Sequence, residues 1–268
     1  DQQFQPIQSM WFATFALAPG FFLPLEQELG RALAHRRARS EGGLPVVGRV
    51  LRLGAGITAT VLIAMAVLSP LIASELFDGN WWMLAALATA FAAYAPAHLA
   101  RGICSGSGRF RAYAVVIGSD GVIRIAVCLL FAVLEIKDPA PYAFAVALSP
   151  LMAVFALRMR GSLTTEPGPP APWSEVTQNL GWLLLGTVFA AALLNAGPLA
   201  ATILGTKADK AAITQFGNGV LLARIPLFLF QAVQAALLPR LARLAAQGDF
   251  AESTIGFRRL LALVVGLG

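Results

Sequence analysis

Long apolar stretches alternate with short polar segments along nearly the whole chain. A helix needs about 20 apolar residues to cross a bilayer, so the pattern predicts seven complete spans and the start of an eighth near residue 256. Lipid-exposed backbone must satisfy its own hydrogen bonds, and each span should therefore be a helix. The sequence predicts an all-α, polytopic transmembrane helical bundle. The predicted spans are 7–25, 50–74, 81–103, 112–135, 139–159, 178–204 and 211–238.

Composition supports the same class. Apolar residues make up 57% of the chain, charged residues 13%, and the mean hydropathy is +0.71, values outside the usual range of soluble domains. The net charge of +6 comes largely from arginines in the polar segments between spans, not from one soluble face. This distribution argues against a nucleic-acid partner.

The basic residues are strongly asymmetric along the chain. The polar segments 26–52, 101–111, 158–177 and 239–259 hold fifteen of the twenty basic residues, and all fifteen are arginines. The alternate segments hold only Lys137, Lys207 and Lys210. Cytosolic loops of membrane proteins carry an excess of Lys and Arg. The arginine-rich segments should therefore face the cytosol.

A proline-rich segment, residues 161–177, divides the chain. Its proline density predicts an extended, stiff cytosolic tether between an N-terminal lobe, 1–160, and the start of a C-terminal lobe, 178–268. A weak internal sequence similarity between residues 19–34 and 226–243 suggests a repeat of six helices, a common arrangement in transporters. With Asp1 as first residue and an apolar run that stops at Gly268, we expect a fragment: helices two to six, then seven, eight and part of nine.

Four segments carry a resemblance to a known family: residues 22–31, residues 101–110, the proline-rich tether and residues 224–243. Together they resemble the polysaccharide-transporter branch of the multidrug/oligosaccharidyl-lipid/polysaccharide exporter superfamily. The resemblance implies two pseudo-symmetric lobes of about six helices around a central cavity. It also implies a multi-pass protein of the cytoplasmic membrane that moves lipid-linked oligosaccharides during cell-surface polysaccharide assembly. Lipid-linked oligosaccharide and membrane lipids are the expected partners.

Polar groups inside the spans are the candidate substrate-binding residues, because charges in hydrocarbon are costly and usually face a bundle interior. Arg124 lies about midway along its span, and Asp120 precedes it by four residues, the favourable order for an ion pair on a helix. The pair could bind a phosphate through the guanidinium. Alternatively, it is an internal ion pair that only specifies packing.

Arg224 lies inside the seventh predicted span, with no acidic residue within one turn of it in the sequence. Pro226 should kink the helix next to it. A guanidinium at this depth suits a pyrophosphate, which it can bind with two hydrogen bonds; the alternative is pairing with an acid from another helix. Gln231 and Gln234 could extend a polar face toward the substrate or hydrogen-bond to neighbouring helices.

Two further positions are candidates. Asn195, beside Gly197 and Pro198, marks either a locally unwound helix that lines the cavity or a packed kink. Glu26 falls where the first span leaves the membrane. Its position there favours a solvated interfacial side chain over a gate or a proton-linked acid.

Enzymatic chemistry is not expected. The arginine-rich segments hold only scattered carboxylates rather than the paired acids of a glycosyltransferase, and the two histidines lie far apart, so neither a metal site nor a cofactor is predicted. The predicted function is alternating-access transport, coupled to a proton, a sodium ion or the membrane potential. A drug or cation antiporter of the same superfamily is the alternative, followed by a membrane enzyme of polysaccharide assembly.

Overall fold

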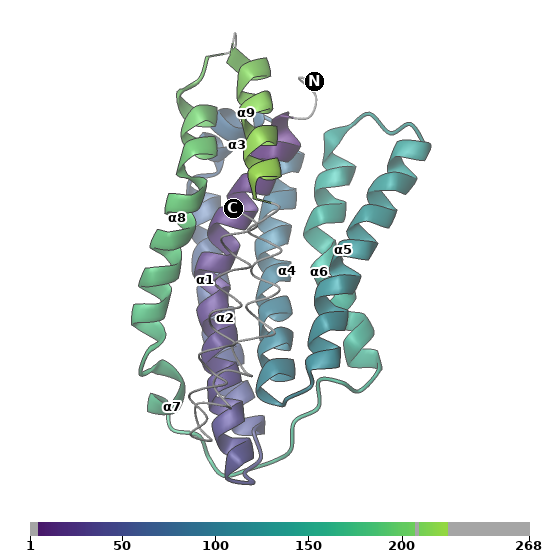
Figure 1. Ribbon diagram of the computed structural model, residues 1–268. Helices are drawn as coiled ribbons and strands as arrows, with labels where there is room; N and C mark the ends of the chain where they lie inside the picture. Colours follow the sequence, from purple (N-terminus) through teal and green to yellow (C-terminus); the bar gives the residue numbers. More distant parts are fainter. Residues whose placement is uncertain (1–4, 207–208, 225–268) are drawn as a thin grey trace, which may run out of the picture. The chain divides into compact units, whose positions relative to one another are not determined.

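The computed structural model describes residues 5–206 and 209–224 (Figure 1). Every regular element in this part of the chain is a helix. The chain divides into two compact units, residues 1–211 and 212–268, and the helices α1 to α8 make up the first unit. The helices are α1 (Gln5–Ala38), α2 (Leu44–Val67), α3 (Ser69–Phe77), α4 (Trp81–Gly106), α5 (Phe110–Val133), α6 (Pro139–Met159), α7 (Ser174–Thr177), α8 (Leu180–Leu204) and α9 (Lys210–Ala223).

Five helical segments of the described chain are long and apolar enough to cross a membrane: α2, α4, α5, α6 and the α7–α8 segment Ser174–Leu204. Exposed surfaces of these helices carry large apolar side chains, for example Val67, Val133 and Leu193. The prediction of an all-α fold is confirmed for the described residues, and the five helices are consistent with an integral membrane protein. The predicted two-lobe arrangement stays a prediction.

Helix α1 differs from its predicted span in length and in character. The prediction ended the span at residue 25, whereas the helix continues to Ala38 and carries Pro19 and Pro24 inside it. It is not among the five apolar helices, and its polar residues Gln5, Ser9 and Thr14 are buried. Helices α4 and α8 flank α1 on two sides (Figure 1). A helix enclosed by other helices needs no continuous apolar surface, which explains its composition.

Helices α1 and α4 approach each other closely at glycines. A Cβ atom added to Gly106 would lie 2.7 Å from the Gly30 carbonyl oxygen, and one added to Gly102 would lie 2.9 Å from the Glu26 carbonyl oxygen. Small residues four apart allow this kind of close packing between membrane helices. On another side of α1, the Thr187 hydroxyl of α8 donates to the Gly20 carbonyl oxygen at 2.7 Å.

The second predicted span, 50–74, is two helices. Helix α2 begins earlier, at Leu44, and ends at Val67, and α3 begins at Ser69. Pro70 lies in the first turn of α3, where proline is well tolerated because the first backbone N–H groups of a helix have no intrahelical partner. Proline in that position starts a new helix rather than continuing the preceding one.

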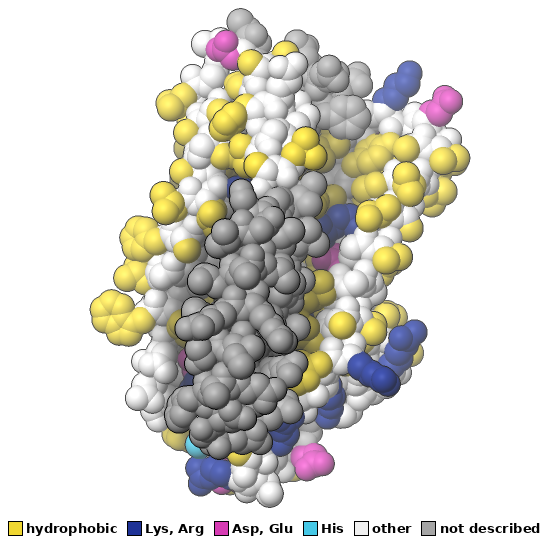
Figure 2. All heavy atoms as spheres, viewed as in Figure 1, with side chains coloured by type: hydrophobic (Ala, Val, Ile, Leu, Met, Phe, Trp, Pro, Cys, Tyr) yellow, Lys and Arg dark blue, Asp and Glu magenta, His cyan; other side chains and the backbone are white. Residues whose placement is uncertain are grey.

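The arginine-rich loops lie together at one end of the first unit. We call this the arginine end, formed by loops 39–43, 107–109 and 160–173. The Leu44 backbone N–H donates to the Glu166 carbonyl oxygen at 3.0 Å, and Arg109 donates to the Ser162 carbonyl oxygen at 2.8 Å. Figure 2 shows Lys and Arg side chains gathered toward this end of the visible face.

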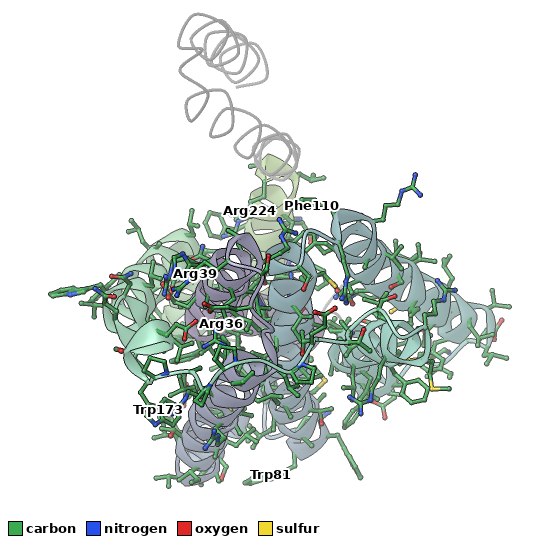
Figure 3. The ribbon with its side chains drawn as sticks, turned by 90° about the horizontal axis from the view of Figure 1, so that it is seen from below. Arg36, Arg39, Trp81, Phe110, Trp173 and Arg224 are labelled. Atoms are coloured by element: carbon green, nitrogen blue, oxygen red, sulfur yellow. The ribbon has the colours of Figure 1, made fainter. Side chains whose placement is uncertain are left out.

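The proline-rich tether is held against the arginine end by Arg36, which is only 3% exposed. The guanidinium pairs with both Glu175 carboxylate oxygens at 2.7 and 2.9 Å and donates to the Pro169 carbonyl oxygen at 2.8 Å. These hydrogen bonds to Glu175 raise the pKa of Arg36. The tether also passes so close to Gly42 that a side chain at Gly42 or Gly168 would meet backbone atoms. Figure 3 views this end and labels Arg36, Arg39 and Trp173.

The position of the loops generates a topology prediction. In a chain with Cys104 and Cys128 replaced by serine, a single cysteine at Arg39 or Thr164 should react with an impermeant thiol reagent only from the cytosol. A cysteine at Glu75 or Lys137, at the opposite end, should react only from the other side, because positive loops stay in the cytosol. Labelling of Thr164→Cys from outside would contradict the assigned orientation.

Candidate functional site: buried charges in the bundle

The first ionic cluster is partly buried and joins α5 to α6. The Arg124 Nη2 atom donates to both Asp120 carboxylate oxygens at 2.9 Å, and the Ser149 hydroxyl of α6 donates to Asp120 Oδ1 at 2.6 Å. Arg124 retains 13% of its side-chain exposure and Asp120 retains 24%. The predicted pairing of Asp120 with Arg124 is confirmed. Ser149, which precedes Pro150 in its helix, was not identified from the sequence, because nothing there shows which face of α6 meets α5.

Aromatic rings of α1 cover the Arg124 guanidinium. Its central carbon lies 5.2 Å from the centre of the Trp11 ring and 5.7 Å from that of Phe15. A cation above an aromatic face is attracted by the negative charge of the ring's π-electrons. Arg124 therefore combines an ionic partner on its own helix with an aromatic contact from α1.

The second buried ionic cluster joins α1, α4 and α5 around Glu26. His98 Nδ1 lies 2.8 Å from Glu26 Oε2, the Tyr113 hydroxyl donates to Glu26 Oε1 at 3.0 Å, and Arg101 Nε lies 3.6 Å from Oε2. Glu26 is 6% exposed and His98 is 3% exposed. A carboxylate, an imidazole, a phenol and a guanidinium thus meet within the bundle.

The burial of Glu26 corrects a prediction. We expected Glu26 to be solvated at the membrane interface, but it is buried, and so is Glu28. The prediction was wrong because α1 does not end at the interface: it continues as a helix against α4, and its acidic residues face other helices. Glu28 pairs with Arg31 at 2.7 Å. His98 of α4 is a direct partner of Glu26.

A line of aromatic rings connects the two clusters. The centre of the Phe15 ring, which contacts Arg124, lies 6.1 Å from the centre of the Tyr94 ring. The centre of the Tyr94 ring lies 6.2 Å from that of the His98 ring. The Tyr94 hydroxyl and His98 Nε2 are buried, and neither has a hydrogen-bond partner in the described part of the chain. Such atoms usually bind water or a ligand. Tyr94 and His98 lie one turn apart on α4, whereas Phe15 comes from α1, so sequence spacing could reveal the Tyr94–His98 contact but not the contact with Phe15.

Asn195 lies in a continuous helix. Helix α8 runs through Asn195 and Pro198 to Leu204, with both residues buried. The Asn195 side-chain amide donates to the Ala191 carbonyl oxygen at 2.8 Å, one turn earlier. A locally unwound helix is therefore not observed at this position. The Thr202 hydroxyl, one turn later, donates to the Pro198 carbonyl oxygen at 2.9 Å.

The remaining candidates lie in the second unit. Arg224 directly follows α9, and its side chain is partly exposed. Pro226 and the predicted kink, together with Gln231 and Gln234, lie outside the described residues. Their predicted substrate-binding role therefore stays a prediction.

The described residues contain no group of three or more His, Cys, Asp or Glu side chains that could hold a metal ion. Comparisons with protein-family models, curated proteins and solved structures found no match.

The geometry predicts strong coupling between Asp120 and Arg124. Asp120→Asn or Arg124→Gln alone should lower the free energy of unfolding by about 1.5–3 kcal/mol, because each leaves a poorly solvated charge without its partner. The double variant should lose less free energy of unfolding than the sum of the two single losses. Thermal unfolding of all variants in the same detergent measures these differences.

Arg111→Gln is the matched control, since Arg111 is an exposed arginine of the same helix. Additive effects of Asp120→Asn and Arg124→Gln would mean that the two side chains do not interact.

Proposed function

We propose that this chain is part of a membrane transporter that moves a lipid-linked oligosaccharide across the cytoplasmic membrane by alternating access. The Asp120–Arg124–Ser149 cluster is the observation that carries the proposal. It places a guanidinium inside a bundle of membrane-length helices, and ionisable groups at such positions usually serve a transport pathway. The resemblance noted in the sequence supports the same function and adds the two-lobe architecture.

Arg124 would bind the diphosphate that links sugar and lipid. A guanidinium matches the spacing of phosphate oxygens and can donate two parallel hydrogen bonds. In the structure those donors face Asp120, so the substrate phosphate would replace Asp120 as the acceptor. Asp120 retains part of its exposure and keeps the Ser149 hydrogen bond, which would hold the carboxylate in place after the exchange.

Arg224 is the second proposed head-group residue. This role follows from its place inside the seventh predicted span. Replacing Arg224 with lysine keeps the charge but loses the planar arrangement of donors. We therefore expect Arg224→Lys to transport slowly and Arg224→Ala to transport least.

The Glu26 cluster favours a coupled mechanism over uncoupled flipping, and it also keeps the antiporter alternative open. An antiporter needs a titratable acid inside the membrane domain, and Asp120 is engaged with Arg124. Glu26 is buried beside His98, and histidine changes charge near physiological pH more readily than other side chains. In this proposal the Glu26–His98 pair exchanges the coupling proton, and Arg124 binds the cargo.

Transport in proteoliposomes tests the proposal. A fluorescent lipid-linked oligosaccharide with a diphosphate should cross faster than in protein-free liposomes. Arg124→Gln should lower the rate by about 10- to 150-fold, the effect of losing one charge-assisted contact of about 1.5–3 kcal/mol. Arg111→Gln is again the control. If Arg124→Gln transports the diphosphate substrate as fast as the unsubstituted protein, Arg124 does not bind the head group. The same conclusion follows if the substitution slows transport of an uncharged glycolipid to the same extent.

A further inference from the structure

A groove of about 630 Å³ opens on the side of the first unit away from the two ionic clusters, between α2 and α8. Phe21 of α1 forms part of its floor. One wall is a stripe of α2, and the other wall is a stripe of α8 that repeats every three or four residues. The wall residues are Arg52, Leu53, Gly56, Ile57, Thr60 and Val61 of α2, and Gly181, Leu184, Leu185 and Val188 of α8.

Each wall of the groove contains a glycine that faces open space. A Cβ atom added at Gly56 or Gly181 would meet no described atom within 4 Å. The two walls therefore do not pack against each other at these positions. The volume lies within the range of about 300–1,000 Å³ that is typical of small-molecule sites, and apart from Thr60 and Arg52 its side chains are apolar.

One end of the groove is cationic. Arg52 lies at the end of the α2 stripe nearest the arginine end, and its guanidinium is 5.5 Å from the centre of the Trp173 ring. Arg49, one turn earlier, stacks on the same ring at 4.5 Å. A guanidinium that stacks by its face still presents N–H donors at its edge, which suits a phosphate.

We infer that this groove binds one anionic phospholipid of the bilayer. An aliphatic chain would lie along Ile57, Val61 and Leu185, and the phosphate would meet Arg49 and Arg52 beside Trp173. These two arginines lie in the first turns of α2, next to the arginine end, where the topology prediction places the cytosolic head groups of the bilayer. That fixed position favours a resident phospholipid over a carrier lipid whose head group must leave the interface. The inference is independent of the proposed transport function.

Native mass spectrometry of the 268-residue chain tests the site. The protein in detergent is titrated separately with phosphatidylglycerol and with phosphatidylcholine that has the same acyl chains. We expect the affinity for phosphatidylglycerol to be about tenfold higher. The double variant Arg49→Gln/Arg52→Gln should remove this preference. Gly56→Leu and Gly181→Leu, which fill the groove from opposite walls, should each weaken phosphatidylglycerol binding by about tenfold or more.

Gly118→Leu and Gly121→Leu in α5 are matched controls, because a Cβ atom at either position also meets no described atom within 4 Å. They should leave lipid binding unchanged, as should Arg111→Gln. Equal binding of the two lipids, or equal losses in the groove and control variants, would overturn the inference.

A photo-cross-linker identifies the occupant directly. Benzoylphenylalanine at Leu185, activated in bilayers that contain phosphatidylglycerol and a polyprenyl phosphate, should add the mass of the phospholipid. Arg49→Gln/Arg52→Gln should reduce this product. Capture of the polyprenyl phosphate instead, or of a peptide from residues 225–268, would show that the groove has a different occupant and would overturn the proposal.

Discussion

The close approach of α1 to α4 is the constraint on which the Glu26 cluster and its aromatic link to Arg124 depend. Gly102 and Gly106 leave room for the α1 backbone at Glu26 and Gly30, so the two helices lie nearer than any larger residues would permit. That distance brings the Glu26 carboxylate against His98, and the same packing carries Phe15 to Tyr94 farther along α1. Without this approach, α1 would present carboxylates and amides to lipid, which is strongly unfavourable.

Buried charge in this bundle is compensated locally. Asp120 and Arg124 neutralise each other within one helix, while Glu26 draws its partners from two neighbouring helices. Compensation of this kind lowers the cost of desolvation but does not by itself add stability. Both clusters contact α1 and are linked by aromatic rings; in the proposed transport function they would serve a charged group that crosses the bundle.

Much of the helical layout could be predicted from the sequence. The predicted span 139–159 coincides with α6, and the predicted starts of the α4 and α5 spans lie within two residues of the observed helices, because an apolar run flanked by turn residues defines a membrane helix well. The Asp120–Arg124 pair was predictable because it follows helical spacing alone. The break at Leu68 was missed, although Pro70 is a recognisable signal for it.

What could not be predicted is which faces of different helices meet. Glu26, His98 and Tyr113 come from three helices, and no local spacing connects them. Burial also changed their interpretation: an acid near the end of an apolar run is usually solvated, and Glu26 is buried only because α1 continues for three more turns against α4. The docking of the tether onto Arg36 had no local signal either, because Pro169, Pro170 and Glu175 lie at least 133 residues away from it in the sequence.

The free energy of unfolding of Gly106→Ala, compared with Gly118→Ala, tests the central role of the α1–α4 contact most directly. In an open position of a helix, such as Gly118, alanine should stabilise by roughly 0.5–1 kcal/mol. At Gly106 the new methyl group would meet the α1 backbone, so we predict a loss of about 1–3 kcal/mol. Stabilisation of Gly106→Ala to the same extent as Gly118→Ala would show that α1 and α4 are not in close contact and would contradict the account.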